Sequence, residues 1–308
     1  MNSAVETSPV DRRLMLVHAH PDDETIGTGA TMARYAAEGA EVSLVTCTLG
    51  EEGEVLVDDL LHLAADNEDD LGPQRLEELT EAMGALGVTD FVRLGGDAHY
   101  RDSGMAYDDK GAAIARTALR PGIFWTTDLL EAANELVPII RSRRPQVLIT
   151  YDENGGYGHP DHIQAHRVAM YAYLLAGVPS YRPDLGASWV VSRVLWSTLS
   201  ESWMRDSIRA LRESGDTESW QGMEADGEMP PMVVADEAIA AVVDGTDFIK
   251  AKMAAMRAHR SQIAADGMFF TMADALGDRA WSHEHYRLAA GTPFPGTGWA
   301  TDLFAGLD

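Results

Sequence analysis

The segment LMLVHAHPDDETIGTGATMARYAAEG (residues 14–39) joins an apolar run to a helical pattern through a short loop of metal-binding residue types. The run LMLVHA (14–19) predicts a buried strand, and TGATMARYAAEG (28–39) predicts a helix that ends at Gly39. Between them, HPDDE (20–24) crowds histidine, aspartate and glutamate into one turn. Either this is a polar loop after a strand or it is half of a metal site, and the rest of the chain decides between the two.

The same alternation of short apolar strands and longer helical patterns continues through the first half of the chain. Strands are predicted over residues 41–48, 90–95 and 146–152, and helices over residues 73–87, 127–144 and 161–176. Pro138 lies inside the second of these helices and is expected to kink it. Strands that alternate with helices form βαβ units, so the sequence predicts an α/β fold with a mostly parallel sheet.

The second half of the chain has a less regular pattern. It is predicted to hold strands at 188–197 and 239–245, helices at 202–214 and 246–263, and an acidic surface loop at 215–231. We therefore expect a core at 1–177 and a smaller C-terminal α+β portion at 178–308, which packs on the core as one continuous structural unit. The long segment 95–122 between a strand and a helix is expected to be functional or disordered.

The composition is typical of a globular protein of a reducing compartment. The chain has 308 residues and a formal net charge of −25, and so acidic a surface repels nucleic acid and anionic lipids. The single cysteine, Cys47, cannot form an intrachain disulfide and is expected to be a buried small hydrophobe. The N-terminus has no signal-peptide pattern and no apolar run is long enough to span a membrane. We expect a cytoplasmic protein with a small-molecule partner, and the oligomeric state stays open.

Two His-Pro-Asp triplets, one at residues 20–22 and one at 159–161, each follow a predicted strand. In open parallel sheets the loops after the strands emerge at one edge, so these triplets should meet there. Two imidazoles and one carboxylate are a common catalytic zinc set, and the sequence offers His20, Asp23 and His162 for it.

The remaining polar residues of the two loops are then free for catalysis. Asp22 could act as a base and His159 as an acid, with Asp161 as the carboxylate that keeps His159 protonated. The alternative is that both loops merely cap helices, with Asp22 and Asp161 as N-caps.

Other motifs carry weaker signals. GTGATM (27–32) is similar to G-x-G-x-x-G but has Met32 at the third glycine position, which leaves open a nucleotide-binding regulatory protein as an alternative of another class. DENGGYGHPDHI (152–163) fails as a calcium loop because it lacks the required glycine and the closing glutamate. His283 and His285 alternate in a predicted strand and are expected to be a surface pair.

HAHPDDE (18–24), with GHPDH (158–162) far downstream, resembles the PIG-L/LmbE-like zinc deacetylases. That resemblance implies a Rossmann-like, twisted sheet with helices on both faces, and one Zn²⁺, or Fe²⁺, per chain. It also implies a metal-dependent N-deacetylase that acts on N-acetylglucosamine-containing substrates. VTCTLGEEGEV (45–55), YRDSGMA (100–106) and TYDENGGYGHPDH (150–162) are similar to the actinobacterial mycothiol-biosynthesis branch of that family, which deacetylates N-acetylglucosaminyl-inositol.

The resemblance also implies roles for individual residues. The metal ligands are His20, Asp23 and His162, the general base is Asp22, and the general acid is His159. Tyr157 corresponds to a tyrosine that polarises the carbonyl, and the sugar-binding positions correspond to Arg75, Asp102 and Glu54. Without the resemblance, Arg75 would be a surface charge on a helix and Asp102 a loop cap.

Two related activities are weighed against the deacetylase. The mycothiol S-conjugate amidases carry a lysine shortly after the first motif and a different loop after the second strand, whereas this chain has HPDDETIGTG and LGEEGE. Both differences favour the deacetylase branch. Deacetylases of other N-acetylglucosaminides, such as those of antibiotic pathways, share the zinc motifs and stay open.

Overall fold

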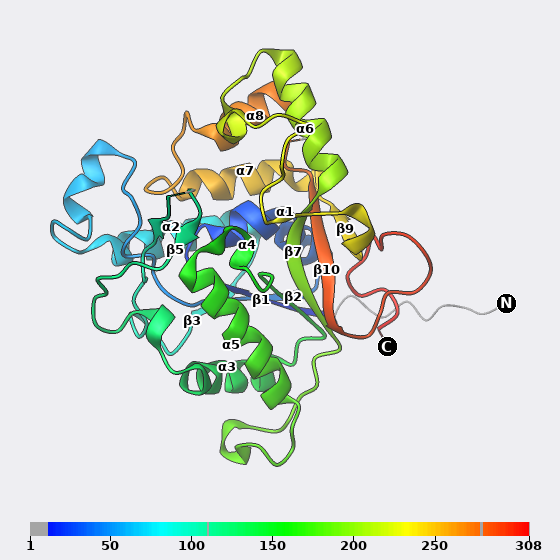
Figure 1. The fold of residues 1–308 in the computed structure, drawn as a ribbon. Helices are drawn as coiled ribbons and strands as arrows, with labels where there is room; N and C mark the ends of the chain where they lie inside the picture. Colours follow the sequence, from blue (N-terminus) through cyan, green and yellow to red (C-terminus); the bar gives the residue numbers. More distant parts are fainter. Residues whose placement is uncertain (1–11, 110, 278–279, 308) are drawn as a thin grey trace.

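The computed structural model describes residues 12–109, 111–277 and 280–307, and its centre is one mixed sheet (Figure 1). The strand order is β3-β2-β1-β6-β7-β10-β9, and β8 pairs with β7. The strands are β1 (Arg13–His18), β2 (Glu41–Thr46), β3 (Asp90–Arg93), β6 (Val147–Thr150), β7 (Arg193–Ser200), β8 (Val233–Val234), β9 (Ala241–Asp244) and β10 (His283–Gly291). The first five strands in the order run parallel, while β10 is antiparallel to both of its neighbours.

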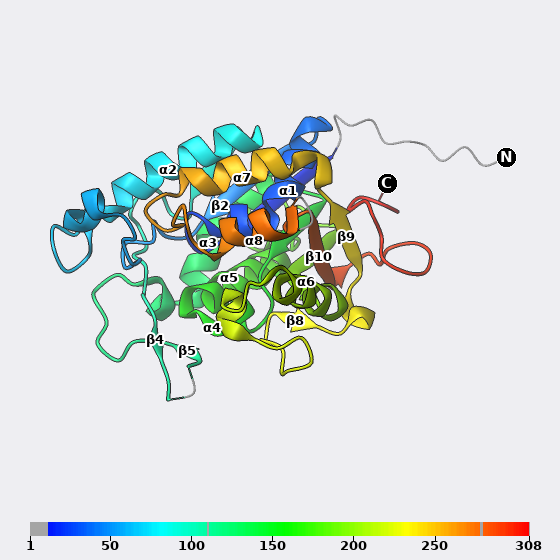
Figure 2. The ribbon, with the colours of Figure 1, turned by 90° about the horizontal axis from the view of Figure 1, so that it is seen from above.

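Helices cover both faces of this sheet. The helices are α1 (Asp23–Ala37), α2 (Leu71–Leu86), α3 (Leu129–Arg143), α4 (Gly155–Gly158), α5 (Pro160–Ala176), α6 (Glu201–Ser214), α7 (Ile249–Ala258) and α8 (Met268–Leu276). Along β1, Leu14 and Leu16 pack with α1, α2 and α7, whereas Met15 and Val17 pack with α3 and α5. Figure 2 shows α1, α2 and α7 side by side. Burial on both faces explains the continuous apolar run of β1 and confirms the predicted Rossmann-like α/β fold.

The order of the parallel strands reverses beside β1. From β1 the chain proceeds to β2 and β3 on one side, and β6 and β7 lie on the other. Loops that follow β1 and β6 therefore leave the sheet next to each other and diverge, which opens a crevice at the carboxyl edge. The first His-Pro-Asp triplet lies in the loop after β1, and the second lies beyond β6 at the start of α5.

The C-terminal half of the chain extends the same sheet. It contributes β7, β9 and β10, and its helix α7 packs against α1 and α2. The division of the chain at residue 177 stays a prediction. No helix in the described part of the chain is long and apolar enough to cross a membrane.

Several predicted boundaries are wrong for a physical reason. Helix α1 begins at Asp23 and not at residue 28, because the carbonyl of Asp22 already accepts hydrogen bonds from the backbone of Thr25 and Ile26. The glycines of GTGATM consequently lie inside α1 and form no phosphate-binding loop. The helix predicted to reach residue 263 ends at Ala258.

The burial of one predicted surface residue differs from expectation. His285 is buried beside the rings of Trp203 and Trp299, so the expected surface pair with His283 is wrong; β10 lies between two other strands, which hides this position. The long segment 95–122 contains a short hairpin of β4 (Ala106–Tyr107) and β5 (Ala113–Ile114). Cys47 is buried, as predicted.

Candidate active site

A cavity of about 630 Å³ lies at the carboxyl edge of the parallel strands. Nearly all residues singled out from the sequence line it: His20, Asp22, Asp23, Glu54, Arg75, Asp102, Tyr157, His159 and His162. Sequence reasoning missed an apolar wall that the C-terminal half supplies, formed by Trp203, Trp220, Met268, Phe269 and Trp281. The cavity thus has a polar floor at the sheet edge and an apolar wall above it.

The geometry of three side chains on the floor fits a divalent metal ion. Nδ1 of His20 lies 3.3 Å from Oδ2 of Asp23, and Nε2 of His162 lies 3.2 Å from Oδ1 of Asp23. Two ligands held 2.0–2.1 Å from a tetrahedral ion are about 3.3 Å apart, so each of the two separations is that of neighbouring ligands, with the two imidazoles facing different oxygens of Asp23. Nδ1 of His162 contacts the carbonyl of Gly155 at 3.2 Å, while its Nε2 is buried and has no hydrogen-bond partner among the described residues. An imidazole fixed in this way by one ring nitrogen can offer the other to a metal.

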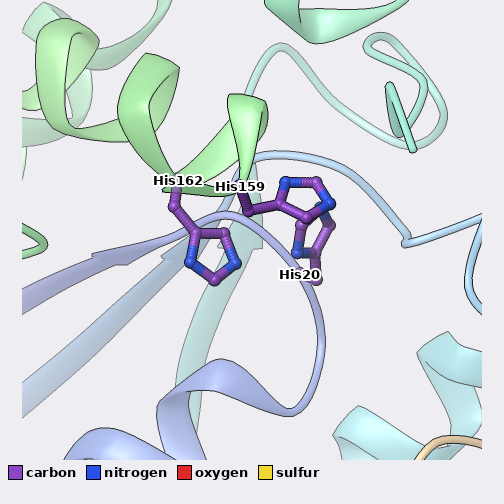
Figure 3. Close-up of side chains that lie close together, drawn as sticks. All are labelled: His20, His159 and His162. Carbon is purple, nitrogen blue, oxygen red and sulfur yellow. The ribbon is translucent and has the colours of Figure 1, made fainter. Parts of the chain in front are cut away.

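Another combination of side chains has its ligand atoms close enough together for one ion. His20, His159 and His162 place one ring nitrogen each within 4.8 Å of the others, and Figure 3 shows their three rings grouped together. Nδ1 of His159 accepts a hydrogen bond of 3.1 Å from the backbone of Asp161 and thereby caps α5, which leaves only its Nε2 free. The two sets share His20 and His162 and differ in whether Asp23 or His159 is the third ligand.

Tyr151 connects the two segments that carry the metal-ligand candidates, and sequence reasoning missed it. Its hydroxyl donates to Oδ2 of Asp23 at 2.7 Å and accepts from the backbone of Ala19 at 2.8 Å. Its ring stacks on His162 with centroids 4.3 Å apart. Partners of this kind fix the orientation of metal ligands. Its place directly after β6 is the only signal that the sequence gives.

Asp22 is held in a strained backbone conformation. Its φ of 124° is unusual for a residue other than glycine and costs about 1–3 kcal/mol. Asp22 occupies the N-cap position of α1, but its carboxylate makes no hydrogen bond to the helix, so the alternative of a capping side chain is wrong. Burial raises the pKa of Asp22 to about 6; Arg75 opposes this shift and Asp23 adds to it. A carboxyl group that titrates near neutral pH suits acid–base work.

Arg75 is buried on α2 and is not the surface charge that its helix alone would suggest. Its guanidinium donates to Oδ2 of Asp22 at 3.0 Å, to the carbonyl of Gly50 at 2.8 Å, and to the carbonyl of Pro21. Arg75 therefore holds both the carboxylate of Asp22 and the turn that carries it.

Asp102 belongs to the same floor. Its Oδ1 accepts from the backbone of Gly104 at 2.8 Å and lies 3.4 Å from Nε2 of His20. Burial by itself would raise the pKa of Asp102, but the imidazole of His20 holds that pKa below its usual range. The loop-cap alternative is thus correct for its backbone contact, and the carboxylate also orients a metal-ligand candidate.

The expected pairing of Asp161 with His159 is wrong. The carboxylate of Asp161 accepts from the backbone and hydroxyl of Ser103 and lies 3.4 Å from Nε2 of His20. Burial lowers the pKa of His159 to about 2, and the nearby His20 and His162 act in the same direction. Asp161 is not an N-cap either, because His159 caps α5 and Asp161 lies in its first turn. The neutral His159, with Nδ1 as acceptor, carries its proton on Nε2.

Tyr157 and Glu54 are the most accessible of the predicted residues. Tyr157 lies on the short helix α4, is 40% exposed, and has its ring centroid 5.1 Å from that of His162. Gly156 and Gly158 on either side of it have φ values of 71° and 102°, which side chains with a Cβ rarely adopt. The side chain of Glu54 is exposed at the cavity mouth.

Comparison with known proteins points to one reaction. A sequence model described as GlcNAc-PI de-N-acetylase (PIG-L) matches residues 15–173, a range that includes both His-Pro-Asp triplets. The chain is 58% identical over 299 residues to a protein of Nocardioides sp. and 56% identical over 298 residues to one of Kribbella flavida. These alignments cover 96% of this chain and 99% and 98% of the relatives, both named 1D-myo-inositol 2-acetamido-2-deoxy-alpha-D-glucopyranoside deacetylase.

Solved structures share the fold at low sequence identity. The N,N'-diacetylchitobiose deacetylase of Pyrococcus horikoshii matches with a TM-score of 0.58 and 19% identity, over 92% of this chain and 86% of the other. The teicoplanin deacetylase Orf2, described in a zinc-inhibited form, matches with a TM-score of 0.53 and 16% identity, over 90% and 97%. At such identities the likeness concerns the fold alone.

Proposed function

This chain belongs to the PIG-L family of GlcNAc-PI de-N-acetylases, and from that premise we propose that it removes the acetyl group from an N-acetylglucosaminyl-inositol. The family membership confirms the resemblance seen in the sequence and makes the chain a deacetylase, a hydrolase of an amide bond. The assignment of this substrate is supported by the match, over nearly the whole length, to relatives that are named for this reaction. We propose a cytoplasmic location, which the single cysteine supports.

We propose that His20, Asp23 and His162 hold one divalent ion, with zinc as the expected metal and ferrous iron as the alternative. The spacing of their ligand atoms and the free Nε2 of His162 support this set. Such an ion acidifies a water molecule and polarises the acetyl carbonyl. Asp102 and Asp161 orient the imidazole of His20. Both carboxylates lie near its Nε2 and so direct its Nδ1 towards Asp23.

Asp22 is proposed to take the proton of the attacking water. It lines the cavity next to the metal-binding residues without contributing to their set. A nearby cation favours the carboxylate, so a bound metal lowers the pKa of Asp22 below the value that burial gives it. Arg75 keeps the carboxylate in place by its hydrogen bond of 3.0 Å.

His159 and Tyr157 are proposed to serve the amide group of the substrate. With Nδ1 of His159 committed to the start of α5, its Nε2–H faces the cavity as a donor. The hydroxyl of Tyr157 can donate to the oxygen on which charge develops, because the glycines around Tyr157 allow it to adjust. The leaving amine then receives its proton from the carboxyl of Asp22, which has taken it from the water, while the neutral His159 only donates a hydrogen bond from its Nε2–H.

Arg75, Asp102 and Glu54 are proposed to contact the sugar hydroxyls, since all three line the cavity beside the metal-binding residues. A second candidate function, hydrolysis of a mycothiol S-conjugate, is favoured by one feature, the apolar wall with Trp203 and Trp281, because a neutral polyol does not require such a wall. The two functions share the same polar floor.

Release of free amine from matched substrates tests this function. Purified protein is given N-acetylglucosaminyl-inositol, N-acetylglucosamine and a mycothiol S-conjugate, before and after chelation and after reconstitution with Zn²⁺ or Fe²⁺. We expect the highest kcat/KM with the inositol glycoside, a loss of activity on chelation, and its recovery with metal. A clearly higher kcat/KM with the S-conjugate would favour the second candidate, and full activity in metal-free protein would exclude the proposed site.

A further inference from the structure

Beyond the residues that line the cavity, we propose that Glu24 and His259 are positioning residues that hold the backbone of Asp22 in its catalytic conformation. The inference rests on the proposed role of Asp22 as the base. Neither residue lines the cavity, so both act through Asp22 and not on the substrate.

The two carboxylate oxygens of Glu24 accept hydrogen bonds from two different parts of the chain. Its Oε2 accepts a hydrogen bond of 2.9 Å from the backbone N–H of Asp22. Its Oε1 accepts one of 2.8 Å from Nε2 of His259, across 235 positions of sequence. Both side chains are completely buried. A short hydrogen-bonded relay thus runs from the segment after α7 to the turn that carries Asp22.

The conformation of Asp22 explains why such a relay is needed. At φ 124° the peptide lies outside the regions that side-chain-bearing residues favour, so the fold must impose it. Glu24 satisfies the N–H of this strained residue, and His259 prevents the glutamate from turning to another rotamer. Arg75 holds the other end of the same residue by its carboxylate. Asp22 is therefore fixed by one partner at its backbone and by another at its side chain.

The residues that follow His259 also make hydrogen bonds close to the candidate active site. The hydroxyl of Ser261 donates to the buried Glu78 of α2 at 2.7 Å. The amide of Gln262 donates to the carbonyl of Glu54 at 3.2 Å and lines the cavity. The sequence HRSQ (259–262), which follows α7, thereby couples the C-terminal half of the chain to the catalytic turn.

Substitutions at one position can separate positioning from general support of the fold. His259→Gln places an amide nitrogen where Nε2 lies, whereas His259→Asn is equally polar but too short to reach Glu24. His285→Leu is the control, because it removes another buried histidine of the C-terminal half that does not line the cavity. Each variant is measured for kcat, KM, bound metal and thermal midpoint, and His259→Asn is also made in an Asp22→Asn background.

A misplaced base lowers the rate of the chemical step by about 10–100-fold. We expect this loss in kcat for His259→Asn, with KM and metal content unchanged, and recovery of most of the rate in His259→Gln. In the Asp22→Asn background, His259→Asn should cause no further loss, since the residue that it positions is already absent. His285→Leu should keep the rate of the unmodified protein.

The outcomes separate this inference from the proposed function. If Asp22→Asn alone keeps the full rate, Asp22 is not the base, and both the role of Asp22 and the positioning inference are overturned. If Asp22→Asn is impaired but His259→Asn lowers kcat equally in both backgrounds, the proposed base survives and the relay is overturned. The positioning role of His259 is also overturned if His259→Gln and His259→Asn are equally impaired. The same holds if the loss of rate follows the thermal midpoint across all variants.

Discussion

The hydroxyl of Tyr151 donates a hydrogen bond of 2.7 Å to Oδ2 of Asp23, across 128 positions of sequence. The same tyrosine stacks on His162, so one side chain contacts metal-ligand candidates from both loops. Losing such a partner typically costs 10–100-fold in metal affinity. We expect Tyr151→Phe to weaken zinc binding by about this factor, because phenylalanine keeps the stacked ring but not the hydroxyl. Competition with a chromogenic chelator measures it, and an unchanged zinc affinity would contradict the prediction.

The identity of the third metal ligand can be decided by metal content. If Asp23 completes the set, Asp23→Ala should lose most of its bound metal, whereas His159→Asn should keep close to one ion per chain. Asparagine can still cap α5, so this variant removes the imidazole without disturbing the helix start. Elemental analysis of the purified variants gives the result. The reverse pattern would assign the ion to the three histidines.

Asp22→Asn should abolish most activity while keeping the metal. Removal of a general base lowers kcat by roughly 10²–10⁴-fold. If Asp22 is instead a ligand, the variant will be purified without metal. Free-amine release and metal content, measured on the same preparation, distinguish these cases.

The same substitution should stabilise the metal-free protein in a pH-dependent way. The pKa of Asp22 is raised from 3.8 to about 6, so between these pH values the folded state retains a proton that the unfolded chain has released. Stability therefore falls as pH rises through this window, by at most about 3 kcal/mol. Asparagine has no charge to bury and avoids this loss.

Denaturant unfolding of the metal-free proteins at pH 4 and pH 7 tests this effect. The free energy of unfolding of Asp22→Asn should exceed that of the unmodified protein at pH 7, and the difference should shrink at pH 4. A difference that is the same at both pH values would mean that the burial of Asp22 is not its cause.

Removing Arg75 should move the acidic limb of the pH–rate profile upwards. The guanidinium favours the ionised form of Asp22, so its loss raises the pKa of that carboxyl. Arg75→Met is expected to shift the acidic limb of kcat/KM to higher pH and to leave the metal content unchanged. Arg34→Met is a matched control, since Arg34 pairs with Glu38 and does not line the cavity. An unshifted limb in Arg75→Met would contradict the electrostatic role.

The sequence by itself determined the arrangement that brings the site together. Apolar runs followed by helical patterns predicted β1, β6 and the helices after them, because a local hydrophobic period reflects the geometry of each element. Parallel strands then place the segments that carry His20 and His162 at one edge of the sheet. The sequence also carried enough family-specific residues to indicate the reaction.

Only the tertiary structure decided which side chains contact each other within that edge. It paired Asp161 with His20 and Ser103 instead of His159, placed Tyr151 between the two loops, and brought His259 to Glu24. Such contacts join residues far apart in sequence, and they depend on how helices pack and how side chains orient, which no local period encodes. Burial likewise set the pKa of Asp22, because the desolvation of a carboxylate is a property of the packed chain and not of the residue.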